Sequence, residues 1–213
     1  WQQATGRAIA GEQAGKQLEF LPISMISWEQ FKSSFPDGQV LSRDTGHSRS
    51  YGSNPYQGYD NINSSPFLFI GPETPGQLPP MARVLTVEIG PEAVAYPYSV
   101  MSEVGVVNDT VSGTDLVVFW QPGVASALDN AIISTGEDVG AVDVFSRELN
   151  GETLSFRFVD GVIEDEQTGS QWNVLGEAVS GELAGEQLER IVAINHFWFS
   201  WAAFKPETRV YTQ

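Results

Sequence analysis

VDVFSRELNGETLSFRFVDGVIED, residues 142–165, is the stretch that decides the fold class of this chain. Apolar and polar residues alternate along it, and Asn150-Gly151 and Asp160-Gly161 interrupt the alternation. Such dipeptides favour tight turns that join antiparallel strands. Three antiparallel strands are therefore predicted, over residues 142–149, 153–159 and 162–164.

The same pattern continues upstream of this stretch. Gly90-Pro91-Glu92 and Ser112-Gly113 each lie between two apolar runs and predict two further hairpins. The four strands expected there are Arg83–Ile89, Ala93–Tyr96, Val104–Val111 and Leu116–Trp120. The sequence therefore predicts a mainly β, β-rich α+β fold, arranged as an antiparallel barrel or sandwich with short flanking helices.

Four short segments are candidates for the flanking helices. Ser27 is a suitable N-cap before WEQFKSSF, because Gln30 completes a capping box and Pro36 follows the end. A second helix is expected within NHFWFSWAAF, residues 195–204, which is apolar nearly all round and therefore more deeply buried. Tyr98–Glu103 could form one helical turn, and Ser126–Thr135 a short helix or a loop.

The two ends of the chain repeat one another. GRAIAGEQAGKQLEFLP, from Gly6, aligns with GEAVSGELAGEQLERIV, from Gly176, and the alignment continues without a gap to Leu41 and Tyr211. Twelve of its 36 positions are identical, including Trp28 with Trp198. One inserted residue also aligns Trp1 with Trp172. A gapless match of this kind indicates a duplicated unit.

The repeat predicts three parts. Residues 1–41 would be the tail of a first repeat unit, residues 42–80 a strap rich in Gly, Pro and Tyr, and residues 81–213 a complete β-rich second unit. The complete partner of the first tail would then lie upstream of Trp1. The alternative is a single domain whose duplicated ends pack as a pseudo-symmetric pair.

Composition excludes several classes of function. The 213 residues carry 27 acidic and 11 basic side chains, a formal net charge of −16, which argues against a nucleic-acid surface. With no Cys, thiolate metal sites and cysteine nucleophiles are impossible within the chain. No apolar stretch is long enough to predict a transmembrane segment. Only Lys16, Lys32 and Lys205 are lysines, and this acid excess indicates a halophilic protein or, alternatively, an ordinary acidic bacterial one.

A ligand site, if the chain has one, is expected where the second tail meets the sheet. Trp and His side chains bind small or planar ligands when their rings are exposed, and they pack in the hydrophobic core when their rings are buried. The candidate ligand-binding residues are Asn195, His196, Trp198 and Trp201, with Trp120, Gln121 and Trp172 as neighbours.

Two other chemistries receive weaker support. Met25 and Asn195 occupy equivalent repeat positions, and Asn195 is next to His196. Met25 and His196 are therefore candidate ligands of a soft metal such as copper. Packing in the hydrophobic core is the simpler role for both side chains. GVASA, from Gly123, places Ser126 in a distorted nucleophile motif that lacks the Gly-x-Ser-x-Gly spacing. No other cofactor is expected.

Four phrases resemble one protein family. They are AYPYSVMSEVGVVNDTVSG (Ala95–Gly113), VVFWQPGVASALD (Val117–Asp129), TGSQWNVLGEAVSGELAG (Thr168–Gly185) and NHFWFSWAAFKPETRVY (Asn195–Tyr211). The chain is identified from them as similar to the family called domain of unknown function 3179. The resemblance implies longer members with two units, in which the first unit carries a Cys-Pro-x-Cys-like segment. The matching segment here, Trp120–Val124, has no Cys.

Three functions are compatible with these patterns. The first is a non-catalytic, extracytoplasmic structural or binding module of a larger acidic protein, since the family resembles exported or membrane-anchored proteins. Its partner would be the upstream repeat unit or another protein subunit. The second is copper handling, with the metal site mainly in an upstream unit. The third is a hydrolase that uses Ser126.

Overall fold

The computed structural model describes residues 1–213. Its first sheet joins the centre of the chain to the C-terminal tail. Its strands are β1 (Arg83–Ile89), β2 (Glu92–Pro97), β12 (Ala193–Phe197) and β13 (Arg209–Val210), in the order β12-β1-β2-β13. β1 pairs antiparallel with β2 and β12, and β13 runs parallel to β2. The second tail therefore completes a sheet that begins at residue 83, far away along the chain.

Two further sheets and one small hairpin hold the remaining strands. The middle sheet contains β3 (Val106–Val111), β4 (Thr114–Gln121) and β5 (Ala141–Ser146). The outer sheet contains β8 (Phe156–Val159), β9 (Val162–Asp165), β10 (Gln171–Trp172) and β11 (Ala178–Ser180), while β6 (Glu148–Leu149) pairs with β7 (Glu152–Thr153). The mainly β prediction is confirmed. The sheets remain open, so they form no closed barrel.

The expected hairpin turns are present where the sequence places them. Ser112, Asn150 and Asp160 all have positive φ, between 48° and 53°, and each is followed by a Gly with positive φ. Two successive residues with positive φ match the twist of the flanking strands, as a type I′ turn requires. Local sequence therefore fixes these three connections.

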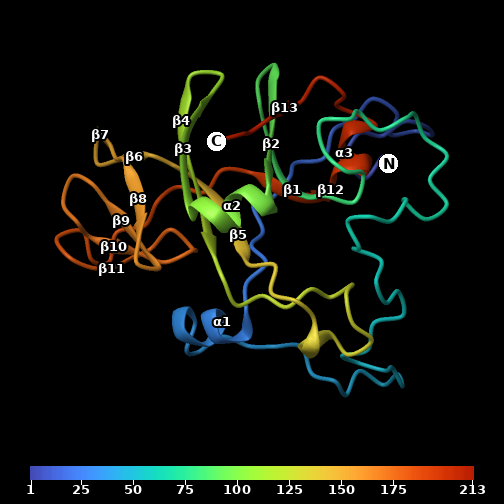
Figure 1. The fold of residues 1–213 in the computed structure, drawn as a ribbon, viewed down its shortest axis with the longest axis horizontal. Helices are drawn as coiled ribbons and strands as arrows, with labels where there is room; N and C mark the ends of the chain where they lie inside the picture. The colour runs from blue at the N-terminus through green and yellow to red at the C-terminus, as the bar shows by residue number, and fades with distance from the viewer.

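β4 lies between two halves of the hydrophobic core. Leu116 and Val118 belong to the cluster shared with β1 and β2, whereas Val117 and Phe119 belong to the cluster shared with the outer sheet. Successive side chains of a strand point to opposite faces, so a strand buried on both faces can contribute to two cores. Figure 1 shows the resulting arrangement, with β8–β11 on one side of β3–β5 and β1, β2 and β12 on the other.

The helices are short. α1 (Trp28–Ser34) begins after Ser27 with the predicted capping box, in which the Ser27 hydroxyl accepts from the Gln30 amide and the Gln30 side chain accepts from the Ser27 amide. α2 (Tyr98–Val104) replaces the start of the strand expected from Val104, and η1 (Ile133–Thr135) is a single 3₁₀ turn. None of the helices has the length and apolarity needed to cross a bilayer.

The second tail corrects one expectation. The helix predicted within residues 195–204 is shorter, because α3 (Trp198–Ala202) begins only after β12 ends. Asn195, His196 and Phe197 are instead paired with β1, opposite Leu85, Val84 and Arg83. Pairing with a strand that is distant in the sequence overrides the local apolar pattern.

Residues 42–80 contain no helix and no strand, and they lie along the body of the molecule. Main-chain amides of Asn54, Gly58 and Tyr59 donate to carbonyls of residues 131, 129 and 128, over 2.9, 2.7 and 3.1 Å. The Tyr59 ring packs on Phe197 with 5.7 Å between ring centroids. These contacts hold the strap against the loop that joins β4 to β5 and against the end of β12.

Candidate binding site

The structure brings together part of the predicted ligand-binding set, on β12 and α3. Asn195 and His196 lie on β12, and Trp198 and Trp201 follow on α3. The Trp201 ring lies against the imidazole of His196, with 5.1 Å between centroids. Trp198 is fully buried, however, and its Nε1 donates to the Pro75 carbonyl. Trp198 therefore packs as core and fastens the strap.

The other three members lie elsewhere. Trp120 and Gln121 end β4, where the Gln121 Oε1 accepts from Gln30 Nε2 of α1 at 3.3 Å. Trp172 is buried in the core beside the outer sheet, and its Nε1 donates to Asp165 at 3.0 Å. These residues do not share a surface with His196, and their ligand binding stays a prediction.

His196 combines burial with an unpartnered ring nitrogen. Its Nε2 is inaccessible to solvent and has no hydrogen-bond partner. Burial lowers the pKa of His196 to about 4, because the low-dielectric surroundings disfavour the imidazolium ion. The side chain is therefore neutral at pH 7, which is the state in which an imidazole can bind a metal.

Met25 and His196 line one cleft, of about 660 Å³, between the first tail and β12. Met25 is 41% exposed. Asn195 also lines this cleft, but its Oδ1 accepts a hydrogen bond from the buried Tyr98 hydroxyl. No group of three or more His, Cys, Asp or Glu side chains is gathered to hold a metal ion.

Ser126 is part of a buried polar cluster. Its hydroxyl donates to Asp60 and accepts from Arg83 Nη2 at 2.8 Å, and Arg83 also pairs with Asp60 at 2.7 Å. Burial would raise the pKa of Asp60, but the hydrogen bonds from Ser126 and Arg83 and the charge of Arg83 lower it below its usual value. A carboxylate held this way is a weak base, and Ser126 is only 1% exposed. This geometry indicates that the cluster attaches the strap to β1.

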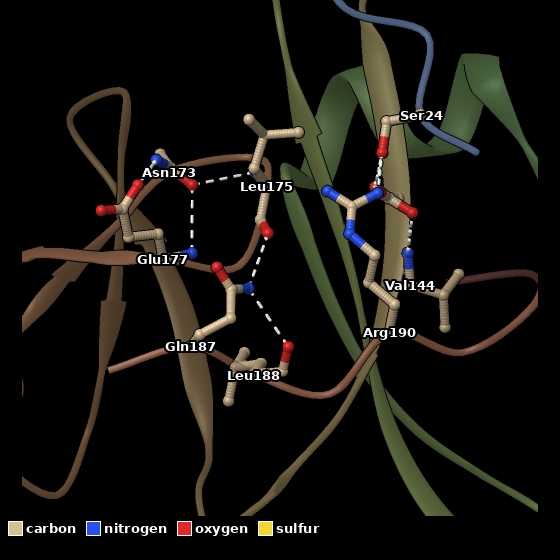
Figure 2. Close-up of polar contacts among 9 residues, drawn as sticks. Ser24, Val144, Asn173, Leu175, Glu177, Gln187, Leu188 and Arg190 are labelled. Carbon is tan, nitrogen blue, oxygen red and sulfur yellow. Dashed lines mark hydrogen bonds and ion pairs between the residues drawn. The ribbon is translucent and has the colours of Figure 1, made fainter. Parts of the chain in front are cut away.

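The repeat is present in the structure as well as in the sequence. In the second copy, Gln187 Nε2 donates to the carbonyls of Leu175 and Leu188, at 2.9 and 3.1 Å (Figure 2). In the first copy, Gln17 Nε2 donates to the equivalent carbonyls of Thr5 and Leu18, at 2.6 and 3.1 Å.

The main chain follows the same scheme. The Leu188 amide donates to the Gly176 carbonyl at 2.9 Å, and the Leu18 amide donates to the Gly6 carbonyl at 2.9 Å. Asn173 Oδ1 accepts from the Leu175 amide in the second copy, and Gln2 Oε1 accepts from the Thr5 amide in the first (Figure 2 shows the second copy). One repeated segment therefore folds in the same way at both ends of the chain.

The two copies differ in what covers them. Leu188 and Trp198 are 1% and 0% exposed, whereas the equivalent Leu18 and Trp28 are 50% and 55% exposed. Only the second copy has a sheet of its own to lie against, because β1 pairs with β12. The exposed large apolar side chains of residues 1–41 are Trp1, Ile9, Leu18, Leu21, Ile23, Met25, Trp28, Phe35, Val40 and Leu41.

A polar anchor that the sequence did not indicate joins the two copies. Ser24 of the first tail donates to Asp143 Oδ2 of β5, and Arg190 of the second tail donates to both Ser24 and Asp143, the latter at 2.9 Å (Figure 2). Burial raises the pKa of Asp143, although Ser24 and Arg190 oppose this shift. The partners are 119 and 47 positions from Asp143, so no local motif could have predicted their contact.

The chain matches one protein family over nearly its whole length. A family model described as "Protein of unknown function (DUF3179)" matches residues 1–208. Neither the curated proteins nor the solved structures contain a match.

Proposed function

We propose that this chain, which belongs to the family described as Protein of unknown function (DUF3179), is a non-catalytic module that binds another β-rich unit through residues 1–41. One observation carries the proposal. The first copy of the repeat keeps the hydrogen-bonded fold of the second, yet Leu18 and Trp28 are about half exposed where Leu188 and Trp198 are buried.

The exposed side chains give such a surface a driving force. Leu21 and Ile23 are 71% and 77% exposed and lie in the same segment as Leu18. Full burial of one large aliphatic side chain contributes about 1.5–3 kcal/mol. Contiguous apolar surface on a water-exposed face is typical of an interaction site. Burying several of these residues at once would therefore support stable binding.

The second copy indicates what the partner looks like. Its Leu188 belongs to the core formed by β4, β5 and the outer sheet. We therefore propose a partner unit that resembles residues 81–171, supplied by the same polypeptide or by another subunit. Its strands would cover Leu18 and Trp28 as those of residues 81–171 cover Leu188 and Trp198.

The absence of Cys allows a direct test by thiol labelling. Leu18→Cys is made in the chain alone and in a tandem in which an added copy of residues 81–171 precedes Trp1. We expect the thiol introduced at position 18 to react at least about tenfold more slowly in the tandem. Glu12→Cys is the matched control, because Glu12 and its equivalent Glu182 are both exposed and the label should react equally in both proteins. Equal reactivity at position 18 in the chain and in the tandem would contradict the proposal.

A second proposal, copper handling, rests on the shared cleft of Met25 and His196 and on the unpartnered His196 Nε2. Thioether and neutral imidazole are suitable ligands for Cu(I), and further ligands would come from the partner unit. The test is competition with a chromophoric Cu(I) chelator, on the chain and on the tandem. Binding that is lost in both Met25→Leu and His196→Ile supports copper handling, and no binding to either protein contradicts it.

We further propose that the module works outside the cytoplasm and in a salty medium. The net charge of −16 supports the second part, because salt screens repulsion among surface carboxylates. The free energy of unfolding should rise between about 0.1 and 3 M KCl. Immunodetection in cell fractions of the source organism tests the location, and a signal confined to the cytoplasm would contradict it.

A further inference from the structure

One segment of the first tail lacks the strand partner that its equivalent has. Residues 23–27 align with β12, residues 193–197, and β12 pairs antiparallel with β1. The main-chain groups of Ile23, Ser24, Met25 and Ile26 form no hydrogen bond within the protein. The segment is therefore a strand position without its neighbouring strand.

Side-chain exposure along the segment alternates as in a strand. Ile23 and Met25 are 77% and 41% exposed. Ser24 lies between them and is held by Asp143 and Arg190, and Ile26, which follows, packs on the core beside the outer sheet. A period of two is the pattern of a strand with one face on the protein and one face open.

Contacts at both ends hold the segment in place. Ser24 is anchored to β5 by the contacts drawn in Figure 2. Ser27 has extended backbone (φ −71°, ψ 160°) and caps α1, so its own amide is bonded to Gln30. The main chain between these anchors stays available to an incoming strand, and little conformational entropy remains to be lost on pairing.

We propose that residues 23–27 accept an added strand from the partner unit, which pairs with them antiparallel as β1 pairs with β12. This inference rests on the proposed function and names the contact through which it is achieved. Strand addition takes its affinity from main-chain hydrogen bonds and its specificity from alternate side chains. The added strand would have the pattern of RVLTVEI, residues 83–89.

The repeat also specifies the register. In the second copy, Asn195 lies opposite Leu85, Ala193 opposite Val87 and Phe197 opposite Arg83. By equivalence, Met25 would lie opposite the partner's counterpart of Leu85, and Ile23 opposite its counterpart of Val87. The two apolar side chains would then meet apolar side chains across the pair, which stabilises a sheet.

Amide hydrogen exchange in the tandem tests this pairing. We expect alternate amides among residues 23–26 to exchange at least about 100-fold more slowly in the tandem than in the chain alone, since ladder hydrogen bonds to the added strand protect them. The amides of residues 45–50 in the strap, which lie far from the proposed contact in sequence, serve as an internal control. If the tandem does not fold, an excess of a synthetic peptide of residues 81–91 is added to the chain instead, with the same readout.

Two proline variants sharpen the test. In an antiparallel pair, amides of alternate residues point to the same neighbour. Only one of Met25→Pro and Ile26→Pro should therefore restore fast exchange of the remaining amides in the tandem, and fast or slow exchange in both variants would contradict the pairing.

The outcomes separate this inference from the proposed function. Protection of the thiol at position 18 with fast exchange at every amide of residues 23–26 overturns strand addition and leaves the binding surface intact. If the tandem shows neither protection of the thiol nor slow amide exchange, both the proposed function and strand addition are overturned. Slow exchange that appears in the chain alone as its concentration is raised would assign the strand to a second copy of this chain and overturn the proposed partner.

Discussion

Trp28 and Trp198 occupy the same position in two copies of one motif, each as the first residue of a short helix, yet Trp28 is 55% exposed and Trp198 is fully buried. The difference lies in the surroundings. Trp198 packs with Val84 and Ala95 of the first sheet. Trp28 instead stacks on Phe31 of its own helix, with 5.5 Å between ring centroids, and the Lys32 ammonium of the same helix lies over its ring. The pair allows the contribution of a missing neighbour to be measured.

Truncation of the two tryptophans should give very different results. Trp198→Ala should lower the free energy of unfolding by about 3–5 kcal/mol, because it leaves a large cavity in the core. Trp28→Ala should change it by no more than about 0.5 kcal/mol, as for other exposed positions. Urea denaturation followed by circular dichroism checks both values. Similar losses in the two variants would show that Trp28 is already covered.

The contact of Arg190 with Asp143 should be needed mainly while Asp143 is ionised. Arg190→Met leaves a buried carboxylate without its cation and should cost roughly 3 kcal/mol at pH 7. Burial raises the pKa of Asp143, so this carboxyl takes up a proton more readily in the folded state than in the unfolded chain, and the cost should shrink as the pH falls. Denaturation at pH 7 and pH 4 measures the change. In an Asp143→Asn background, Arg190→Met should cost much less, and an equal cost would contradict the ionic role.

His196 should make stability depend on pH below neutrality. Its pKa is lowered to about 4 in the folded state, whereas an unfolded histidine takes up a proton near 6.5. The unfolded state therefore binds more protons between these values, and the free energy of unfolding should fall as the pH is lowered from about 6.5 to 4. His196→Ile, which copies Ile26 of the first tail, should remove this part of the pH dependence. The same pH dependence in His196→Ile as in the unmodified protein would contradict this assignment.

Gly105 and Gly151 form a matched pair of substitutions to Ala. Both have positive φ, 72° and 85°, so both substitutions introduce backbone strain of about 1–2 kcal/mol. A Cβ at Gly105 would lie 2.3 Å from the Phe158 ring, whereas a Cβ at Gly151 meets nothing within 4 Å. Gly105→Ala should therefore cost about 1–3 kcal/mol more than Gly151→Ala. Thermal unfolding compares them, and equal costs would show that the ring moves aside freely.

Local sequence predicted the elements whose causes are local. The Asn150-Gly151 turn requires positive φ at two successive residues, and the Ser27 cap needs only Gln30 three positions later. The candidate site was predicted in part, because Asn195 and His196 are adjacent in the chain. Trp172 and Trp120 could not be placed from the sequence, since their surroundings are formed by strands far away along the chain.

The sequence by itself determined that the chain is mainly β, that its hairpins turn at three dipeptides, and that its two ends carry one repeated motif. These properties depend on residue spacing and on backbone preferences that act over a few positions. Tertiary structure alone decided which copy of the repeat is buried against a sheet and that Ser24, Asp143 and Arg190 are in contact. It also decided that β12 pairs with β1, whereas residues 23–27 pair with no strand. Burial and strand pairing depend on which distant segments become neighbours, and a linear pattern does not contain that information.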